Sequence, residues 1–359
     1  MVRIKDIAKE ANVSEGTVDR VLHNRGGVSK KTEAKVKKIL ESTNFSINPI
    51  ASALAMKNKH HIAVLMPEYA DADAFWKAPH LGVLKASEEL KNFGINIVNF
   101  KFDQYNKQSY IESFQRSLKS KPSAVIFVPM FIEETKQMVQ QMENETIDYL
   151  FLNVDVDGFR NKAFVGQNSY TAGYIAGKLM YLCAPKSLAF LTIQSRDSVR
   201  GNNAISNRIT GFCNYFNSNN IKVELLNLKI EDLVATTKMQ QTIQSFLTEH
   251  ASVGGVFVPS SRISTIVNSL NEQVVSSLQW VGFDNTPQNM ECLKNGSVSF
   301  LISQKPFDQG YESVRIMVDF LLKNKMPESK IYLPIDILTK ENVMYNDINQ
   351  RLFEKEFEK

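Results

Sequence analysis

A short polar surface near the start of the chain carries side chains that can hydrogen-bond to nucleic acid. It comprises Ser14, Glu15, Gly16, Thr17 and Arg20. An arginine can contact the edge of a guanine or a phosphate, and a glutamate can accept a hydrogen bond from the amino group of a cytosine. Ser14 is of the type that caps a helix N-terminus. The pattern favours base contact by a helix that begins near residue 15, although Glu15 could instead only stabilise the helix dipole.

A second group of polar and aromatic side chains follows predicted strands farther along the chain. Flat aromatic rings stack on the apolar face of a sugar ring, while carboxylates and amides bind its hydroxyls. The residues of these types are Phe75, Trp76, Asn153, Asp155, Ser260, Ser261 and Asp284. Two of them could have a structural role in place of sugar binding: Phe75 could pack within a lobe, and Asp284 could cap a helix ahead of Pro287. The group as a whole predicts a sugar-binding site.

The polar surface needs a scaffold, and residues 3–24 predict two short helices joined by a tight turn. The inward-facing residues are Ile7, Ala8 and Ala11 in the first helix and Val18, Val21 and Leu22 in the second. Val13 fills the corner between them, and a third helix over Lys31–Ser42 can close the small core. This arrangement is typical of a DNA-binding helix-turn-helix. An ordinary helical hairpin that binds nothing would show the same spacing.

The distribution of charge favours the DNA-binding interpretation. Residues 1–60 contain 12 Lys and Arg residues against 6 Asp and Glu residues, whereas the remaining 299 residues contain 30 against 32. A phosphate-binding module requires a local excess of positive charge. The basic character of the chain is therefore confined to the segment with the helix-turn-helix pattern.

From residue 61 onward, short apolar runs alternate with helical patterns. The predicted strands are His61–Met66, Ile95–Phe102, Ala124–Val128, Tyr149–Asn153, Ser187–Ile193, Val223–Leu228, Val253–Val258 and Leu278–Phe283. The predicted helices are Leu81–Phe93, Ser109–Leu118, Glu133–Met142, Ala172–Leu182, Ile205–Asn217, Thr237–His250 and Ile263–Leu270. Short strands separated by helices indicate parallel sheets. The series is too long for one sheet, and a seam near Gly166–Gly173 divides it into two doubly wound halves.

The last part of the chain is expected to return to the first half and to finish in the second. The strand Ser299–Ile302 and the helix Phe307–Leu322 are assigned to the first half, and Ile331–Leu338 to the second. Open parallel sheets bind ligands at the carboxyl ends of their strands. Because the aromatic and polar residues of the second group follow strand ends, they are expected to line such a site.

Five short runs stand out in the first 60 residues: Ile4–Ala8, Val13-Ser14, Thr17–Asn24, Val28–Thr32 and Asn48–Ala51. Together they resemble the headpiece of LacI/GalR-type transcriptional regulators, and the similarity continues more loosely through nearly the whole chain. Two positions depart from the family pattern. Asp19 stands where the family usually has a serine before the arginine, and the pair that usually selects bases is Glu15-Gly16, which is an unusual combination.

The resemblance implies a headpiece, a hinge and a type I periplasmic-binding-protein fold with a ligand cleft between two lobes. In such proteins the hinge helix pairs with its twin in a dimer, enters the minor groove and wedges a leucine between base steps. The matching residue is Leu54, on a segment that could also be a plain linker helix. The DNA-binding set is then Ser14, Glu15, Gly16, Thr17, Arg20, Asn24, Ser29, Asn48, Ala51 and Leu54.

The resemblance also implies which residues bind the effector. Asn153 falls where the family often has a sugar-binding aspartate, Asp284 lies in its late aspartate motif, and Gln304 matches a glutamine on the final crossover. Arg208 resembles the arginine that spans the cleft, unless it forms a salt bridge at the lobe surface. Ser260-Ser261 stands where an Asn-Asp pair is usual. The effector-binding set is Phe75, Trp76, Asn153, Asp155, Arg208, Ser260, Asp284 and Gln304.

The composition is that of an ordinary globular protein. Of its 359 residues, 43% are hydrophobic and 22% charged, which suits two or three domains. The sequence has no apolar run long enough for a transmembrane helix and no export signal pattern, so we expect a cytoplasmic protein without a membrane partner. Cys183, Cys213 and Cys292 are widely spaced, which favours buried thiols over disulfides or metal ligands.

No pattern of an enzyme is found in the sequence. It contains no G-x-S-x-G motif, no Walker loop and no glycine-rich dinucleotide loop after a strand. Gly26-Gly27 follows a helix and is interpreted as a turn. We therefore expect no catalytic residues, no metal and no cofactor.

The sequence predicts an all-α headpiece at residues 1–45, a hinge helix or linker at 46–60, a two-lobed α/β domain at 61–345 and a charged tail at 346–359. The N-lobe is expected at about 61–168 and 297–324, and the C-lobe at about 169–296 and 325–345. The predicted function is a repressor of carbohydrate-utilisation genes that binds a double-stranded DNA operator as a homodimer and responds to a small sugar effector. A sugar-responsive activator or corepressor-type regulator, or a transporter's solute-binding protein, remains as an alternative.

Overall fold

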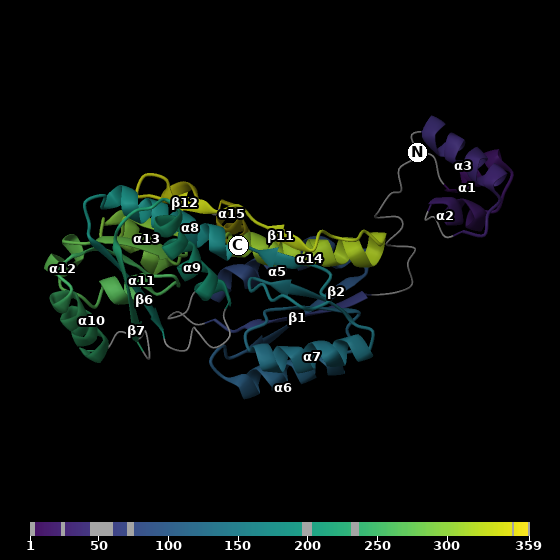
Figure 1. Ribbon diagram of the computed structural model, residues 1–359. Coiled ribbons are helices and arrows are strands. Elements are labelled where there is room, and N and C mark those ends of the chain that lie inside the picture. The colour runs from purple at the N-terminus through teal and green to yellow at the C-terminus, as the bar shows by residue number, and fades with distance from the viewer. Residues whose placement is uncertain are drawn as a thin grey trace. The chain divides into compact units, whose positions relative to one another are not determined.

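The computed structural model describes residues 4–22, 26–43, 60–69, 75–195, 203–230, 237–346 and 348–357 (Figure 1). The chain divides into two compact units, Met1–Lys57 and Asn58–Lys359. The predicted hinge at 46–60 lies outside the described residues, apart from His60, which opens the first strand.

The described part of the first unit, which we call the headpiece, consists of three short helices. α1 spans Ile4–Ala11, α2 spans Glu15–Leu22 and α3 spans Lys30–Ser42. Its core residues are Ile7, Ala8, Ala11, Val18, Val21, Val36 and Ile39. Each helix contributes one apolar stripe, and the core forms where the three stripes meet. The predicted helix-turn-helix and its third helix are confirmed.

Two turns of the headpiece use a left-handed backbone conformation. Asn12, between α1 and α2, has a φ of 57°, and asparagine is one of the few residues with a side chain that adopts this region readily. Gly26 and Gly27, between α2 and α3, have φ values of 66° and 76°. A Cβ atom added at Gly27 would lie 2.9 Å from Nη1 of Arg20. The two glycines therefore form the predicted turn and leave room for the Arg20 side chain.

Two six-stranded sheets form the framework of the second unit (Figure 1). The N-lobe sheet has the order β11-β5-β4-β3-β1-β2, and its strands are β1 (His60–Pro67), β2 (Ile95–Phe102), β3 (Ala124–Phe127), β4 (Asp148–Leu152), β5 (Phe164–Gly166) and β11 (Lys330–Tyr332). The C-lobe sheet has the order β12-β10-β9-β8-β6-β7, and its strands are β6 (Ala189–Ser195), β7 (Glu224–Ile230), β8 (Val253–Phe257), β9 (Gln279–Phe283), β10 (Phe300–Ser303) and β12 (Asp336–Leu338). Within the described strands every pairing is parallel except that of β10 with β12. The predicted pair of doubly wound sheets is confirmed.

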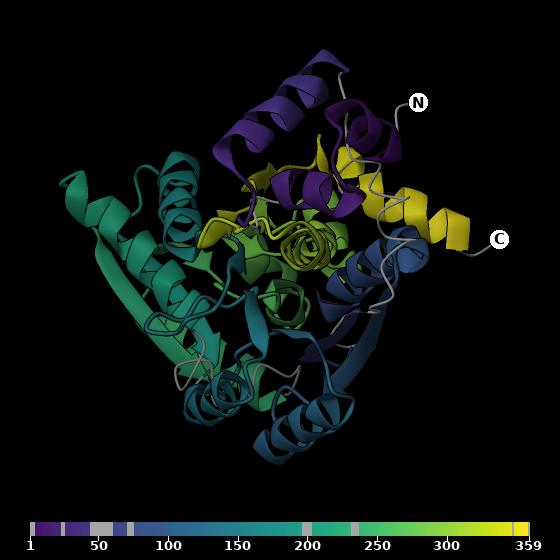
Figure 2. The same ribbon diagram turned by 90° about the vertical axis from the view of Figure 1, so that its right-hand side faces the viewer.

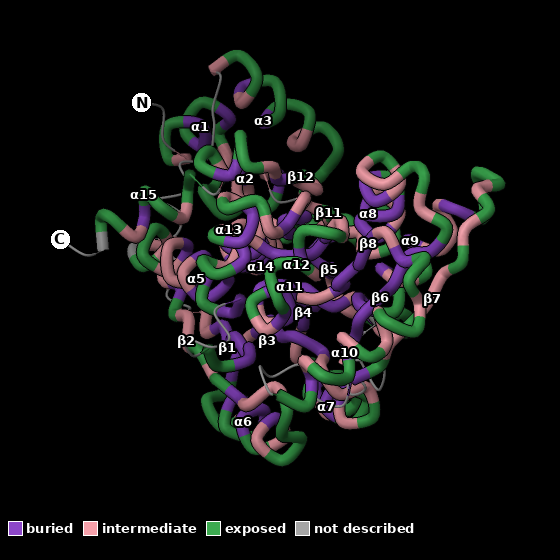
Figure 3. Tube along the Cα trace, turned by 90° about the vertical axis from the view of Figure 1, so that its left-hand side faces the viewer, coloured by how far each residue is buried: buried purple, intermediate pink, exposed green. Residues whose placement is uncertain are grey.

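Helices cover both faces of each sheet. In the N-lobe, α5 (Lys77–Leu90) and α14 (Pro306–Lys323) lie on one face, and α6 (Lys107–Lys119) and α7 (Ile132–Asn144) lie on the other (Figure 1). In the C-lobe the helices are α8 (Ser169–Cys183), α9 (Asn203–Ser218), α10 (Thr237–Glu249), α11 (Ile263–Val267), α12 (Glu272–Ser276) and α13 (Pro287–Lys294). Neighbouring residues of β6 face opposite ways, since Phe190 packs in the core under α8 and α9 while Leu191 packs in the core under α10 and α11. The inner strands, such as β3 and β4, are the most continuously buried parts of the unit, whereas the edge strands β2, β7 and β11 are partly exposed (Figure 3). Of the helices in the described ranges, none is both long and apolar enough to cross a membrane.

Within the described residues, three crossovers connect strands of the two lobes, and the second and third differ from the prediction. The segment 297–324 was assigned to the N-lobe, but its strand β10 pairs with β9 in the C-lobe, with Leu301 opposite Gly282. Conversely, β11 pairs with β5 in the N-lobe, although 325–345 was assigned to the C-lobe. Hydrophobic periodicity identifies a strand but does not say which sheet receives it. The crossovers therefore follow β5, β10 and β11.

The predicted charged tail at 346–359 is mostly helical. α15 spans Ile348–Phe357 and lies beside α5, as the yellow C-terminal helix in Figure 2 shows. Phe353 is buried against Ala78 and Phe307, which both belong to N-lobe helices. One buried aromatic residue thus attaches the predicted charged tail to the N-lobe.

Candidate functional site

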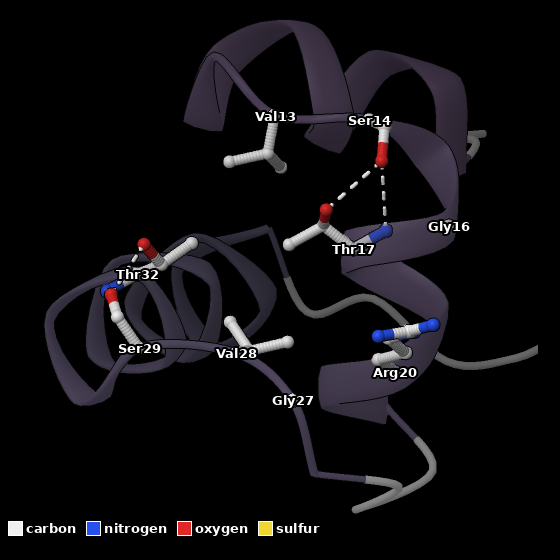
Figure 4. A pocket seen from close by; sticks show the side chains of 9 residues that line it. All are labelled: Val13, Ser14, Gly16, Thr17, Arg20, Gly27, Val28, Ser29 and Thr32. Carbon is white, nitrogen blue, oxygen red and sulfur yellow. Dashed lines mark hydrogen bonds between the residues drawn. The ribbon is translucent and has the colours of Figure 1, made fainter.

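A cavity of about 490 Å³ lies between α2 and α3 in the headpiece. Nine residues line it, among them Ser14, Thr17, Arg20, Ser29 and Thr32 (Figure 4). Arg20 projects from α2 on one side of the opening, and the first turn of α3 lies on the other. A cavity lined by hydroxyl groups and one guanidinium can accommodate a hydrogen-bonding anion.

Both helices that border the cavity begin there with a serine cap. Oγ of Ser14 accepts a hydrogen bond from the backbone amide of Thr17 at 3.1 Å, and Oγ of Ser29 accepts one from the amide of Thr32 at 3.2 Å. The predicted capping role of Ser14 is therefore confirmed. A helix N-terminus carries a partial positive charge and is a ready site for phosphate. The positive ends of two helices and the charge of Arg20 thus converge on one cavity.

The exposed start of α2 carries the side chains expected to contact bases. Glu15, Gly16 and Arg20 are exposed, and Thr17 is half-buried. A Cβ atom added at Gly16 would meet only Oγ of Ser14, at 3.8 Å, so the surface is open there. Among the other predicted DNA-binding residues, Ser29 is exposed at the start of α3. Asn24, Asn48, Ala51 and Leu54 lie outside the described residues.

In the second unit, five polar side chains gather where the carboxyl ends of the two sheets meet. We call Asn153, Arg208, Asp284, Gln304 and Gln309 the polar cluster, and each is at most 9% exposed. Asn153 directly follows β4 and Asp284 directly follows β9, with φ values of 66° and 71°. These are the strand ends at which open parallel sheets bind ligands.

Hydrogen bonds within the polar cluster connect the two lobes. Nδ2 of Asn153 donates to Oε1 of Gln309 at 3.0 Å and to Oε1 of Gln304 at 3.4 Å. Nε2 of Gln304 donates to Oδ1 of Asp284 at 2.7 Å. Nε2 of Gln309 donates to the Gln304 carbonyl at 2.8 Å and so holds that residue in place. A displacement of one lobe relative to the other must therefore change this network.

Arg208 supplies the positive charge of the polar cluster. Nη1 of Arg208 donates to the Pro259 carbonyl at 2.8 Å, and the guanidinium lies 4.0 Å from the centre of the Phe283 ring. Burial lowers the pKa of Arg208 to about 10 and Asp284 opposes the shift, so the group is charged at neutral pH. The alternative of a salt bridge at the lobe surface is wrong, because the side chain is buried.

The alternative role of Asp284 as a helix cap is also wrong. α13 is capped by Thr286, whose side chain accepts a hydrogen bond from the amide of Asn289. Asp284 instead accepts from Gln304 and acts on the charge of Arg208. Its carboxylate is thus committed to the polar cluster.

Three buried polar atoms have no hydrogen-bond partner among the described residues. They are Nε of Arg208, Oε1 of Gln167 and Oγ of Ser260. Ser260 follows Pro259, the acceptor of Arg208, and Gln167 donates through Nε2 to the carbonyl of Ser303, next to Gln304. Buried polar groups of native proteins are normally hydrogen-bonded. The unsatisfied donor, acceptor and hydroxyl adjoin the polar cluster and match a ligand that both donates and accepts.

The predicted aromatic residues lie in the N-lobe core. Phe75 and Trp76 are 8% and 4% exposed, and their rings meet edge to face with centroids 5.0 Å apart. Nε1 of Trp76 donates to Oε1 of Gln104 at 3.1 Å. In the described part of the chain, neither ring has a hydrogen bond or ring contact to the polar cluster. These contacts support the packing alternative for Phe75.

Asp155 is held by a lysine from β11, the strand at the edge of the N-lobe sheet. Nζ of Lys330 in β11 lies 2.7 Å from Oδ2 of Asp155 and 3.0 Å from Oδ1 of Asp157. The hydrogen bonds to these two carboxylates raise the pKa of Lys330. The ion pairs attach β11 to the loop that follows β4. Asp155 therefore has a structural role in addition to its predicted role in effector binding.

Sequence reasoning missed Gln167 and Gln309. Gln309 lies in the first turn of a helix and is fully buried, whereas Gln167 is 2% exposed at the first crossover. The available signal was position: Gln167 lies within the predicted seam, and Gln309 follows Gln304 by five residues. A glutamine in a helix is ordinarily a surface residue, so the residue type of Gln309 does not predict its burial.

His80 ties the first turns of α5 to the end of β1. Its Nε2 donates to the Pro67 carbonyl at 2.9 Å, and its ring centroid lies 5.2 Å from that of Tyr69. Burial lowers the pKa of His80 to about 4, and the positive charge of Lys101 adds to this shift. His80 is therefore neutral in the folded protein at pH 7.

We expect stability to fall on acidification because of His80. Between pH 6.5 and 4 the unfolded chain binds a proton at this residue that the folded chain does not, so the free energy of unfolding decreases as the pH falls. At pH 4.5 the loss from this group is about 2–3 kcal/mol. Urea unfolding at pH 7 and pH 4.5 measures it, with His80→Gln as the non-titrating comparison that can still donate to Pro67. An equal acid-induced loss in both proteins would show that His80 is not the responsible group.

Known proteins share both parts of this architecture. Residues 62–325 match the periplasmic binding protein domain family, and residues 3–48 match the family of bacterial regulatory proteins, lacI family. The HTH-type transcriptional regulator RegA of Clostridium saccharobutylicum is 25% identical over 353 residues, which cover 95% of this chain and 99% of the relative. The ribose operon repressor of Lactococcus lactis subsp. lactis is 20% identical over 351 residues, covering 96% and 98%.

A solved structure shows the same second unit. A protein of Bacteroides fragilis assigned as a LacI transcriptional regulator superposes with a TM-score of 0.73 at 28% identity, covering 80% of this chain and 99% of that chain. The order of the two matched parts is also the order of the two units found here, with a helix-turn-helix first and two α/β lobes after it. The chain therefore belongs to the lacI family of bacterial regulatory proteins, as a DNA-binding transcriptional regulator with a periplasmic binding protein domain.

Proposed function

We propose that this regulator represses genes of carbohydrate use and that a sugar or sugar derivative, bound at the polar cluster, controls its affinity for a DNA operator. The observation that carries the proposal is the network that joins Asn153 of the N-lobe to Asp284 of the C-lobe through Gln304. A ligand with several hydroxyl groups can replace these hydrogen bonds and also satisfy Nε of Arg208 and Oε1 of Gln167. The relative named as a ribose operon repressor supports a sugar as the ligand class.

In the proposed DNA complex, α2 lies in the major groove with its first turn toward the base edges. Glu15 is then a side chain that distinguishes bases. The capped ends of α2 and α3 receive a phosphate, and Arg20 contacts either that phosphate or the edge of a guanine. A homodimer would place two headpieces on the two halves of a roughly palindromic site. The predicted cytoplasmic location suits a protein that acts on DNA.

The proposed switch is the relative position of the two lobes. A ligand that binds one arrangement of the lobes more tightly shifts the population toward it. In a dimer, this movement changes the distance between the two hinge segments that precede β1, and with it the fit of the headpieces to the operator. We propose the sugar as an inducer, which lowers operator affinity.

Thermal-shift screening of the full-length protein tests the ligand class. The panel contains pentoses, hexoses, disaccharides and sugar phosphates, together with nucleosides and amino acids as other polar metabolites. A ligand at 100 times its dissociation constant adds about 2.7 kcal/mol of stability, which is readily measured. We expect a sugar or sugar derivative to raise the unfolding temperature. Stabilisation only by members of the other classes would contradict the proposal.

The Glu15→Gln variant is expected to relax base preference at one position of each half-site. Glutamine keeps the length of the side chain but replaces a carboxylate, which only accepts hydrogen bonds, by an amide that also donates and can pair with adenine as well as cytosine. The expected loss of discrimination is about 1–3 kcal/mol at that base pair, measured by competition among operators that differ at single positions. Glu10→Gln, an exposed change on α1, serves as the control. An equal loss of affinity on all sequences would mean that Glu15 stabilises the helix dipole and reads no base.

A further inference from the structure

The segment after β12 is anchored first in the C-lobe. Val343, in a single 3-10 turn over Val343–Tyr345, is 3% exposed and belongs to the C-lobe core. Nδ2 of Asn346 donates to Oδ2 of Asp336 at 2.8 Å, and Oδ1 of Asn346 accepts from Nδ2 of Asn285 at 2.8 Å. Asn285 is the residue that follows Asp284 of the polar cluster. The first anchor is therefore attached next to the proposed effector site.

The same segment is then anchored in the N-lobe. Phe353 of α15 is 7% exposed and packs on Ala78 and Phe307, with the rings of Phe353 and Phe307 centred 6.2 Å apart. Nζ of Lys77 lies 3.5 Å from Oε1 of Glu354. Ala78 and Lys77 belong to the first turn of α5, directly after Trp76. The second anchor thus holds the helix that begins at the predicted aromatic pair.

The two anchors lie on different lobes although they are separated by only a few residues. Asn346 ends the C-lobe contacts, and Phe353 makes the N-lobe contact. The part of α15 that precedes Phe353 is mostly exposed: Ile348 is 52% and Leu352 is 57% exposed. α15 lies beside α5 (Figure 2), so the segment forms a connection between the lobes that is separate from the three crossovers.

We propose that the described residues 339–346 and 348–357 form an interlobe strap that restricts separation of the lobes. When the first turn of α5 moves away from the end of β9, either the Phe353 contact or the Asn346 contact must break. One aromatic side chain and one exposed ion pair make the N-lobe anchor the weaker of the two, since an exposed ion pair contributes little. The strap therefore opens at Phe353, and its docking sets how readily the lobes change position.

The strap also regulates the effector site, and this part of the inference rests on the function proposed above. Its C-lobe anchor is attached to Asn285, the residue after Asp284 of the polar cluster, and its N-lobe anchor holds the first turn of α5. A docked strap favours the arrangement in which the polar cluster is joined across the lobes, and release of the strap allows other arrangements. We expect loss of the N-lobe anchor to change the apparent affinity for the effector at least threefold.

Pulsed electron–electron distance measurements on the full-length protein test the strap without sugar or DNA. Spin labels are attached through Lys136→Cys on α7 and Ser245→Cys on α10, which are exposed positions on the two lobes, and Cys183, Cys213 and Cys292 are replaced by alanine. In Phe353→Ala we expect a broader distribution with an additional population at longer distance. Leu352→Ala removes an exposed apolar side chain from the same helix and is expected to leave the distribution unchanged. Identical distributions in the parent and Phe353→Ala proteins would overturn the proposal.

A second pair of variants avoids any loss of folding. Glu354→Lys places a positive charge next to Lys77. Glu356→Lys makes the same change at an exposed position of α15, two residues farther along the chain. We expect the first to shift the distance distribution in the direction of Phe353→Ala and the second to leave it unchanged. Equal behaviour of the two charge variants, together with an unchanged Phe353→Ala distribution, would exclude a strap.

The distance measurements test the strap separately from the thermal-shift test of the proposed function. If the distances change but no sugar stabilises the protein, the strap stands and the effector assignment fails. If a sugar binds and controls operator affinity while the distances stay unchanged in Phe353→Ala, the effector assignment stands and the strap fails. The threefold change in effector affinity is measured by calorimetry with the sugar that the thermal-shift panel identifies, and equal affinities in Phe353→Ala and Leu352→Ala would remove the regulatory role.

Discussion

Alanine in place of Arg208 is expected to abolish the response of this regulator to its effector. The change removes the guanidinium that lies on Phe283 and donates to the Pro259 carbonyl, and with it the Nε donor available to a ligand. It also removes a buried positive charge that interacts with the carboxylate of Asp284, and loss of one of two interacting buried charges destabilises a protein by about 3–5 kcal/mol. We expect at least a 100-fold loss of sugar affinity, measured by calorimetry, and a loss of stability of that order in urea unfolding.

A surface arginine in a similar setting provides the control for this variant. The guanidinium of Arg315 lies 5.6 Å from the centre of the Tyr311 ring, but the side chain is half exposed. Arg315→Ala is therefore expected to lower stability only slightly and to leave sugar binding intact. Arg208→Lys keeps the charge but loses the planar group, and we expect it to fall between the two. Sugar affinity within threefold of the wild type in Arg208→Ala would refute the assignment of the effector site.

Operator affinity is expected to fall about 1,000-fold or more between 50 and 200 mM salt. Six or more phosphate contacts by a dimer give a loss of this size, because each contact releases counterions from the DNA. The physical basis here is the excess of positive charge in residues 1–60 and the two capped helix ends beside Arg20. The measurement is fluorescence anisotropy of a labelled operator at a series of salt concentrations.

The slope of that series also shows what Arg20 contacts. If it binds a phosphate, Arg20→Gln lowers the slope by about one for each half-site; if it binds a guanine, the variant loses discrimination at one base pair. Lys37→Gln, on α3 and paired with Glu33, is the control for loss of a headpiece charge outside the cavity lining. Salt-insensitive binding by the wild type would contradict the phosphate site between α2 and α3.

The sequence predicted local elements well because local patterns determine them. In the headpiece, the spacing of Ile7, Ala8 and Ala11, the cap at Ser14 and the glycine turn each agree with one another and with the observed helices. In the second unit, β2 was predicted at its observed bounds, Ile95–Phe102. Alternation of strands and helices was sufficient to identify two parallel sheets.

Long-range placement was less accessible to prediction. β10 was assigned to the wrong lobe, because the run Phe300–Ser303 is equally apolar whichever sheet it joins. The sequence predicts only a charged tail where α15 lies, because its helical period carries one buried aromatic residue, Phe353, among charged ones. The lobe of β10 is determined by its pairing with β9, which is a separate element. The position of α15 is determined by the contact of Phe353 with Ala78 and Phe307, which are distant in the sequence.

The candidate effector site was predicted in part. The rule for strand ends and the family resemblance together selected Asn153, Arg208, Asp284 and Gln304, which the structure brings into one cluster. Their roles in binding stay predictions. Gln309 was missed because it acts through Asn153 and Gln304 from within a helix, where its residue type gives no sign of burial.

Operator affinity with and without a bound sugar tests the proposed regulator most directly. The wild-type, full-length protein is titrated onto its labelled operator in the presence of the sugar identified by thermal shift, at a concentration that calorimetry shows to be saturating. We expect the dissociation constant to rise at least tenfold, a coupling free energy of about 1.4 kcal/mol. In Asp284→Asn we expect unchanged operator affinity without sugar and no rise with it. An operator affinity that stays the same in the wild type when the sugar is bound would contradict the proposed switch.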